Sequence, residues 1–320
     1  MRNRFVNKFH VRFPVCSAGM AMIATPELVA AVSNAGGIGI LGTGPVPPDW
    51  LRSAIRDVRS RTSKPFAVNL IHESTAAFGP LTTEDHIVVC AEEAVDLVVF
   101  FWQLPKSGWV NLLQRANVPF VVTAGSIKAI EEAVELPLSG LILQGTEAGG
   151  HVRAEMPLKD LLQRTRTKYP EQILIGAGGI ANAEDVRNAM TWGADAVCLG
   201  TRFVACTEAN AHPEYQRRII AARAADTVVT DIFGPEWPGV PMRVISNKAT
   251  HGESSDESIG TTEFFGRSYE LPPNSAVLPM RNTTGDFDMM CLAAGESIEH
   301  IDNVKSAAAI VAELFDGWPQ

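Results

Sequence analysis

The segment Ile173–Phe203, ILIGAGGIANAEDVRNAMTWGADAVCLGTRF, contains a complete strand–helix–strand unit. Two short apolar runs, Ile173–Gly176 and Ala196–Leu199, flank a helical pattern over Asn182–Trp192. Both runs are continuously apolar, which is typical of parallel strands buried on both faces. A strand, a helix and a second strand in this order form the repeating unit of parallel α/β folds.

The same unit recurs through the N-terminal two thirds of the chain. Six further apolar runs precede the segment, at Phe13–Cys16, Gly37–Leu41, Phe66–Ile71, Leu97–Trp102, Phe120–Thr123 and Leu141–Gln144. Helical patterns lie between the runs, at Pro26–Asn34, Pro48–Arg61, Asp85–Ala94, Lys128–Leu136 and Leu158–Lys168. Eight regular units without an intervening linker predict an α/β fold, the TIM (β/α)8 barrel. The main alternative is a doubly wound sheet split into two domains.

The alternation of strand and helix patterns ends after these eight units, and we expect three regions in the chain. Residues 1–207 would form the barrel, 208–290 a small C-terminal excursion capping the barrel mouth, and 291–320 a helix that returns to the barrel. In the cap, a helical pattern at Pro213–Ala225 leads into the segments Thr227–Phe233 and Met242–Asn247. The returning helix is expected from the amphipathic pattern Ile298–Phe315.

Composition narrows the class of protein. The 320 residues are 46% hydrophobic and carry a net charge of −9, which argues against a nucleic acid or an anionic membrane as the main partner. Basic clusters at Arg52–Arg61 and Arg164–Lys168 have helical spacing and are interpreted as solvated helix faces. The five cysteines include no CxxC pair, and no apolar run is long enough for a signal peptide or a membrane span. We therefore expect a cytoplasmic protein without disulfides or a metal site, and we leave open a homo-oligomer.

The candidate site follows from the fold, because TIM barrels place active sites at the carboxyl ends of their strands. Glycine-rich turns after the last two strands expose backbone N–H groups and predict a phosphate site, while Asn69 and Gln144 are interpreted as partners of a heteroaromatic ring edge or as hydrogen-bonded core amides. The candidate ligand-binding residues at these ends are Ala18, Gly19, Met20, Asn69, Gln144, Ala177, Gly178, Gly179, Gly200 and Thr201.

The sixth strand is followed by a more specific pattern, LILQGTEAGGHV, at Leu141–Val152. Gly149 and Gly150 allow a backbone to approach a flat ligand, and His151 directly after them is able to exchange protons with that ligand. Glu147 is expected either to orient the loop and the imidazole or to accept hydrogen bonds from backbone amides. This combination predicts a cofactor site with His151 as the catalytic base.

In these motifs the chain resembles the nitronate monooxygenase family, formerly called 2-nitropropane dioxygenases. These are FMN-dependent TIM-barrel flavoenzymes. The resemblance rests on PVCSAGMAMIATPELVAAVSNAGGIGILG, FAVNLI, LILQGTEAGGHV, the segment quoted first and CLAAGESIEHI. It implies that FMN lies across the barrel mouth, contacted by the residues named above, and that His151 is the catalytic histidine. The chain departs from the family's pattern at two places. It has Cys16-Ser17-Ala18 where the family often has a polar pair such as Gln-Gly. Near the C-terminus it has Glu296 where relatives often have Gly-Gln.

Three functions are compatible with these patterns. The first is oxidation of alkyl or propionate nitronates with O2 by an FMN-dependent monooxygenase. The second keeps the flavin but takes electrons from NAD(P)H, as in enoyl-ACP reductases and quinone reductases, which share the barrel and a loop like EAGGH. The third is a barrel that binds a phosphorylated ligand without redox chemistry. The substrate in each case would be a small molecule.

Overall fold

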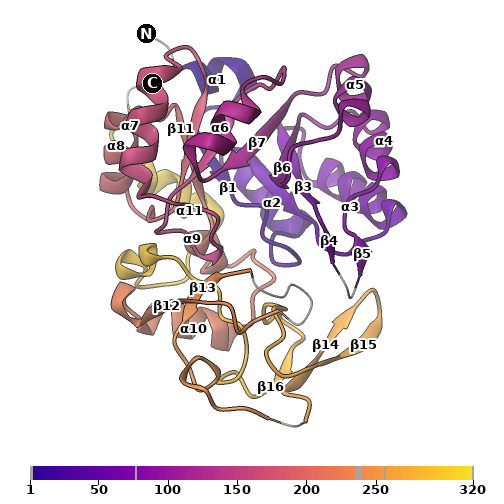
Figure 1. Cartoon of the computed structure of the whole chain (residues 1–320), viewed down its shortest axis with the longest axis vertical. Coiled ribbons are helices and arrows are strands. Elements are labelled where there is room, and N and C mark those ends of the chain that lie inside the picture. The colour runs from indigo at the N-terminus through magenta and orange to yellow at the C-terminus, as the bar shows by residue number, and fades with distance from the viewer. Residues whose placement is uncertain (1–2, 76–77, 235–239, 256, 319–320) are drawn as a thin grey trace.

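The computed structural model describes residues 3–75, 78–234, 240–255 and 257–318. Its central sheet contains eight parallel strands: Val15–Ser17 (β1), Gly39–Gly42 (β2), Phe66–His72 (β3), Leu97–Trp102 (β6), Phe120–Ala124 (β7), Leu141–Gln144 (β8), Leu174–Ala177 (β10) and Ala196–Leu199 (β11). Their order in the sheet is β1-β11-β10-β8-β7-β6-β3-β2 (Figure 1). A parallel bridge between Cys16 and Ile38 joins the two end strands and closes the barrel. The predicted TIM barrel is thus confirmed, and the doubly wound alternative is wrong, because an open sheet would leave both end strands unpaired.

Helices surround this barrel. They are Pro26–Asn34 (α2), Pro48–Arg61 (α3), Glu84–Glu92 (α4), Ser107–Arg115 (α5), Ile127–Ala133 (α6), Leu158–Lys168 (α7) and Ala183–Thr191 (α8), with Ala307–Leu314 (α11) from the C-terminal end of the chain. Helix α11 contacts α2 and α8, so it closes the ring between the last and the first helix. The expected single helix over Ile298–Phe315 is wrong in extent: Glu296–His300 forms a 3₁₀ turn (η3), and α11 begins only after Ser306, which caps Ala309.

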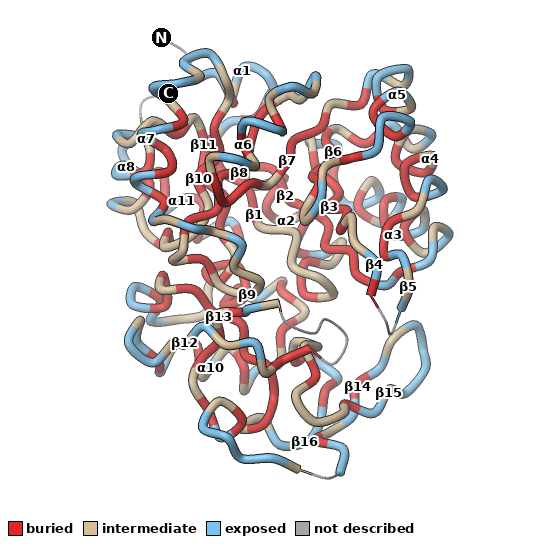
Figure 2. Tube along the Cα trace, viewed as in Figure 1, coloured by how far each residue is buried: buried red, intermediate tan, exposed pale blue. Residues whose placement is uncertain are grey.

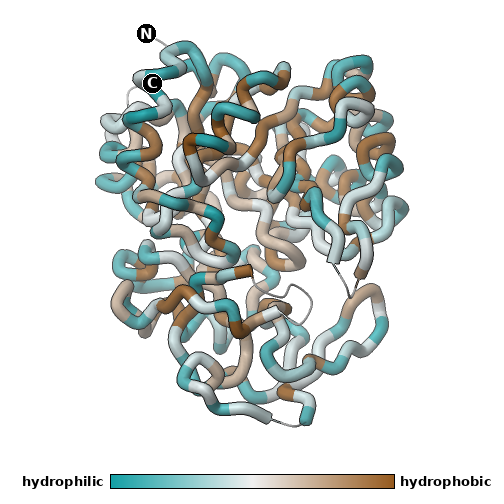
Figure 3. The backbone as a smooth tube through the Cα atoms, viewed as in Figure 1, coloured by the Kyte–Doolittle hydropathy of each residue, from teal (hydrophilic) through white to brown (hydrophobic). Residues whose placement is uncertain are grey.

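The buried residues of the barrel form two layers, one on each face of the sheet. Figure 2 shows that the barrel strands are mostly buried. The inner layer contains strand residues such as Ile40, Val99, Ile142 and Ile175. The outer layer lies between the strands and the helices. Figure 3 shows that the barrel strands consist largely of hydrophobic residues. Burial on both faces explains why the strand sequences are continuously apolar.

The N-terminal end of the barrel is sealed by a short helix that the sequence analysis did not include, Arg4–Phe9 (α1). Asn3 caps it by accepting a hydrogen bond from the Val6 amide, and the Asn3 side chain also donates to the Asp195 carbonyl at 2.7 Å. Phe5 and Phe9 belong to the inner core layer, so α1 extends the core beyond the ends of the strands. The cofactor-sized opening is therefore left at the opposite, carboxyl end.

The predicted solvated helix faces are confirmed in part, because the side chains of Arg56 and Lys168 remain 65% and 54% exposed. Several of the basic residues are also paired. Arg52 and Arg56 on α3 form ion pairs with Glu93, and Arg59 pairs with Asp96 at 2.8 Å. Arg166 on α7 pairs with Asp195 at 2.5 Å. These ion pairs join neighbouring βα units. The five cysteines are free and buried.

Residues between β11 and α11 form smaller elements over the carboxyl end of the barrel (Figure 1). They are Thr201–Val204 (α9), Pro213–Ala221 (α10), Ala224–Asp226 (η1), Thr227–Thr230 (β12), Met242–Ile245 (β13), Ala249–His251 (η2), Gly260–Phe264 (β14), Arg267–Leu271 (β15) and Thr284–Gly285 (β16). Strand β13 pairs with β12 and with Gly150–His151 (β9), while β14 pairs with β15 and β16. Two further short strands, Ser74–Thr75 (β4) and Gly79–Pro80 (β5), extend the loop after β3.

Because α1 seals the N-terminal end of the barrel, its buried side chains should contribute to the stability of the protein. Phe5→Ala should lower the free energy of unfolding by about 3–5 kcal/mol, because a fully buried phenyl ring is replaced by a cavity. Phe265→Ala is the matched control, since that ring is 48% exposed and should contribute about 1 kcal/mol or less. Denaturant titration of both variants measures the difference, and equal losses would show that α1 is not part of the core.

Candidate active site

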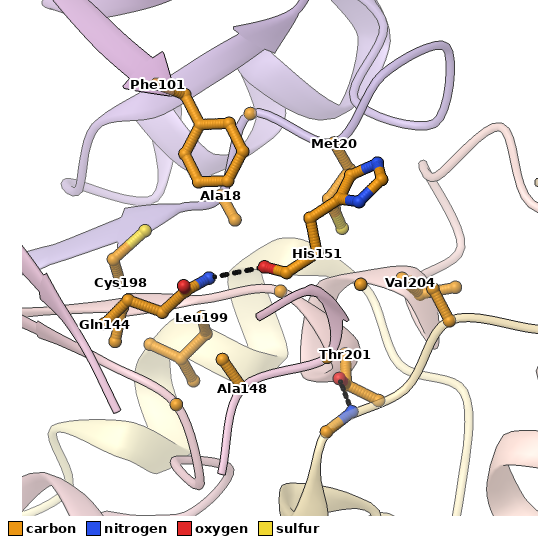
Figure 4. A pocket seen from close by; sticks show the side chains of 18 of the residues that line it. Ala18, Met20, Phe101, Gln144, Ala148, His151, Cys198, Leu199, Thr201 and Val204 are labelled. Atoms are coloured by element: carbon orange, nitrogen blue, oxygen red, sulfur yellow. Dashed lines mark hydrogen bonds between the residues drawn. The ribbon is translucent and has the colours of Figure 1, made fainter. Parts of the chain in front are cut away.

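A cavity of about 270 Å³ lies at the carboxyl ends of the barrel strands. Every predicted site residue lines it: Ala18, Gly19, Met20, Asn69, Gln144, Gly149, Gly150, His151, Ala177, Gly178, Gly179, Gly200 and Thr201. Figure 4 shows several of these side chains pointing toward one another from different strands. The strand-end rule therefore brought together residues that are up to 183 positions apart in the sequence, from Ala18 to Thr201.

One wall of the cavity consists of backbone without side chains. Gly178 and Gly179 have φ of +111° and +72°, values that other residues rarely adopt, so glycine is required there. Gly200 precedes α9, and a Cβ at this position would make only ordinary contacts with Ala18 and Met20. Glycine at 200 thus leaves open space in the cavity rather than relieving backbone strain.

A second pair of glycines brings two loops into direct contact. A Cβ on Gly149 would lie 2.4 Å from the Gly295 amide nitrogen, and one on Gly295 would lie 2.7 Å from the Glu147 carbonyl oxygen. The Gly295 amide also donates to the Thr201 hydroxyl at 3.0 Å (Figure 4). The loop after β8, the start of α9 and the segment before η3 are consequently packed as one unit.

Gln144 holds the strand that carries His151. Its side-chain Nε2 donates to the His151 carbonyl at 3.0 Å, and its Oε1 accepts from the Arg153 amide at 3.0 Å (Figure 4). On its other side, β9 pairs with β13, with His151 opposite Met242. The core-amide interpretation of Gln144 is therefore correct in part: its amide bonds backbone, yet the side chain also lines the cavity.

Burial keeps the His151 imidazole neutral at physiological pH. Desolvation, with a smaller contribution from the positive charge of Arg153, lowers the pKa of His151 to about 4. The ring meets Trp102 edge to face, with centroids 4.9 Å apart. Trp102 has a φ of +94°, an unusual conformation for a side chain of this size, and its carbonyl accepts a hydrogen bond from Arg153.

The two acidic residues near the loop bind protein groups. The Glu147 carboxylate accepts from the Leu158 amide at the start of α7, at 3.0 Å, which is the second of the two roles expected for it. Burial raises the pKa of Glu147. Glu296 forms an ion pair with Arg243 at 3.0 Å and is absent from the cavity lining, whereas its neighbours Gly295 and Ser297 belong to it.

The floor of the cavity is apolar. Ile40, Val99, Ile142 and Cys198 contribute to it from the inner core layer. Burial raises the pKa of the Cys198 thiol to about 12, which leaves it protonated and a poor nucleophile. Among the residues that the structure describes, no group of histidine, cysteine and acidic side chains is arranged to hold a metal ion.

Several lining residues were not found from the sequence. Phe101 ends a barrel strand with Trp102, and the strand-end rule applied to β6 would have found both. Tyr215, Met242, Ala276 and Leu278 come from the elements after β11. The Tyr215 hydroxyl donates to the Ala293 carbonyl. No local pattern in the sequence indicates which of these later residues reach the barrel mouth.

Comparison with known proteins places this site in a family. The family model described as nitronate monooxygenase matches residues 2–317. The chain belongs to the nitronate monooxygenase family. Among curated proteins it is similar to the probable nitronate monooxygenase of Bacillus subtilis strain 168, at 27% identity with 98% of each chain covered. A probable nitronate monooxygenase of Staphylococcus saprophyticus is 30% identical over 80% of this chain and 82% of its own.

Solved structures agree on the architecture. FabK from Thermotoga maritima has a TM-score of 0.80 and 30% identity, with 98% of this chain and 95% of that chain covered. Nitroalkane oxidase from Streptomyces ansochromogenes has a TM-score of 0.78 at 24% identity, with 95% of each chain covered, and shows the fold alone. Membership of the family makes this chain an oxidoreductase that works with a flavin, so the non-redox binding barrel is not supported. None of the helices that the structure describes has the length and apolarity needed to cross a membrane.

The contact between loops predicts a difference between two glycine-to-alanine changes. Gly149→Ala should destabilise the protein by about 1–3 kcal/mol, because the new methyl group collides with backbone at Gly295. Gly200→Ala should stay within about 1 kcal/mol of the wild type, since its methyl group meets only ordinary contacts. Thermal unfolding of the cofactor-free proteins measures both, and equal stability of the two variants would contradict the packing described.

The low pKa of His151 predicts a specific sensitivity to acid. In the unfolded chain its pKa is near 6.5, and in the folded chain it is about 4, so folding opposes protonation. The stabilising contribution of the neutral ring is complete above pH 6.5 and is lost as the pH falls toward 4. His151→Asn should lose less thermal stability over this range than the wild type does. His10→Asn, at an exposed left-handed position that suits asparagine, is the control and should follow the wild-type curve.

Proposed function

We propose that the protein is an FMN-dependent oxidoreductase that oxidises alkyl or propionate nitronates with O2, with His151 as the base near the flavin. The observation that carries the proposal is the cavity itself. It combines a glycine wall, an apolar floor and a half-buried, neutral histidine at the mouth of a barrel from the nitronate monooxygenase family.

The residues around the cavity fit FMN. Backbone amides at Gly178, Gly179, Gly200 and Thr201 would hold the phosphate, because the three glycines bring no side chain to this part of the cavity lining. Phosphate binding after the seventh and eighth strands is common in TIM barrels. Ala18, Gly19 and Met20 would contact the ring system through backbone, and the side chains of Asn69 and Gln144 would meet its polar edge.

When bound, the flavin supplies the electron-transfer chemistry, and the protein supplies position and proton transfer. The neutral His151 ring has one unprotonated nitrogen, which can accept the α-proton of a nitroalkane and so convert the nitroalkane into the nitronate. A negatively charged nitronate beside the ring would favour the protonated form that burial otherwise opposes. Gln144 and β13 hold the backbone of His151, so they act as positioning groups. The apolar walls exclude water from the reacting atoms.

A second candidate, a flavin reductase that uses NAD(P)H, is favoured by one observation. The chain's loop at Glu147–His151, EAGGH, resembles the loop of enoyl-ACP reductases and quinone reductases, which take electrons from NAD(P)H. Anaerobic mixing of the FMN-loaded protein with NADH or NADPH separates the two. The nitronate proposal predicts that the flavin stays oxidised with either nucleotide and is bleached by a nitronate. Rapid bleaching by NAD(P)H alone would instead support the reductase.

The role of His151 is tested by substitution. His151→Asn should keep FMN bound and lower the turnover of the neutral nitroalkane by about 10²–10⁴-fold, the usual effect of losing a positioned acid or base. His10→Asn at the far end of the barrel is the control and should leave turnover unchanged. Steady-state kinetics combined with the flavin absorbance of each purified variant provides both readouts. Unchanged turnover in His151→Asn would remove this residue from the catalytic role.

The phosphate assignment is tested at Gly200. Gly200→Val should fold, because φ there is not positive and a Cβ has room, but its side chain would occupy the phosphate space. The variant should therefore purify largely without flavin. Gly179 is a poorer choice for this test, since its φ of +72° would strain any replacement. A fully yellow Gly200→Val protein with wild-type affinity for FMN would show that the phosphate lies elsewhere.

A further inference from the structure

A second cavity of about 380 Å³ lies beside the first. One wall comes from barrel loops and includes Met22, Gly44 and Leu81. The opposite wall comes from the β14–β15 hairpin, with Phe264, Phe265 and Tyr269. Figure 1 shows this hairpin beside the loop that carries β4 and β5. The cavity thus lies between the barrel rim and a hairpin of the region 208–290, which the sequence analysis expects to cap the barrel mouth.

The two cavities are neighbours that share part of their lining. Ala21, Ile71, Ala276 and Leu278 line both. Two of these four residues are alanines, so the boundary between the cavities is formed partly by short side chains. A molecule with its reacting group near His151 is therefore able to extend past this boundary into the second cavity.

The second cavity is apolar. Among the described residues that line it, Arg267 at the hairpin is the charged one, and the polar side chains are few. The hydroxyl of one of them, Thr75, already accepts a hydrogen bond from the Phe78 amide. A lining of this kind offers little to a polar ligand, and it favours hydrocarbon through the removal of apolar surface from water.

The hairpin wall is held in place by aromatic contacts. Phe265 meets Trp50 at the start of α3 edge to face, with centroids 5.7 Å apart. Phe264 meets Tyr269 across the hairpin at 5.6 Å. Phe78 and Phe265 remain 41% and 48% exposed although both line this cavity. Large aromatic side chains exposed at the rim of an apolar cavity are typical of a ligand entrance.

From this arrangement we propose that the second cavity binds an unbranched alkyl arm of the substrate. The proposal rests on the proposed function, because the nitro end of the substrate would lie near His151 in the first cavity. It specifies the substrate class: a primary nitronate with a chain of several carbons rather than a two- or three-carbon compound. The arm would pass Ala21 and Ala276 and end among Phe264, Phe265 and Tyr269.

Binding of a series of 1-nitroalkanes, from nitroethane to nitrooctane, tests the proposal. Calorimetry with the FMN-loaded protein under anaerobic conditions should show affinity rising by about three- to four-fold for each added methylene until the cavity is filled. Affinity that does not change from nitroethane to nitrooctane would overturn the proposal.

A substitution that fills the second cavity tests whether the gain in affinity with chain length arises there. Gly44 lines the second cavity but not the first. A Cβ there would contact Ala21 at 3.7 Å, so Gly44→Leu should fold and fill part of the second cavity. It should leave nitroethane binding unchanged and abolish the gain from longer chains. Gly108→Leu on α5, where a Cβ meets nothing within 4 Å, is the matched control and should keep the gain. Val277→Phe fills the same cavity from the other wall if Gly44→Leu does not fold.

The outcomes distinguish this proposal from the proposed function. Chain-length dependence that is lost in the filled variants, without turnover of any nitronate, would support the alkyl site and contradict the reaction. Turnover of ethyl nitronate with no dependence on chain length would support the reaction and contradict the alkyl site. Chain-length dependence that persists in both filled variants would also contradict it, because the arm would then bind elsewhere.

Discussion

The site depends on how the short strand β9, Gly150–His151, is held between the barrel and the elements above it. Gln144 in the barrel bonds the backbone at His151 in the strand and at Arg153 just after it. Strand β13 pairs with its other edge and continues to a bridge between Val244 and Ala293. The segment at Gly295 then contacts Gly149 and Thr201. These successive backbone contacts fix the positions of His151, Thr201 and the segment at Gly295 relative to one another.

That arrangement also determines the charge of the site. Because β9 is covered on both sides, His151 is desolvated and its ring stays neutral. The acidic groups nearby are engaged with protein partners, Glu147 with the Leu158 amide and Glu296 with Arg243. The acid at position 296, a departure from the pattern expected for the family, therefore has its charge balanced outside the cavity. A neutral, apolar cavity with backbone amides at one end suits a flat ring with an anionic tail.

The sequence predicts the barrel and the strand-end residues that line the first cavity, because both follow from local patterns. Continuous apolar runs locate the strands, and Gly178, Gly179 and His151 then lie where strands end. Other features depend on contacts between distant segments and have no local signal. Examples are the plug formed by Phe5 and Phe9, the bonding of Gln144 to the strand that carries His151, and the contribution of Tyr215 and Met242 to the cavity. The polar stretch containing Gly260–Phe264 resembles a surface loop in sequence, yet it forms one wall of an apolar cavity.

The most direct test of the account compares the binding of FMN and riboflavin to the cofactor-free protein by quenching of flavin fluorescence. The account predicts that both ligands bind at one site and that riboflavin binds at least about tenfold more weakly, because it lacks the phosphate that the amides at Gly178, Gly179 and Gly200 would hold. Equal affinity for the two ligands would contradict the phosphate site, and no binding of either would contradict the flavin site itself.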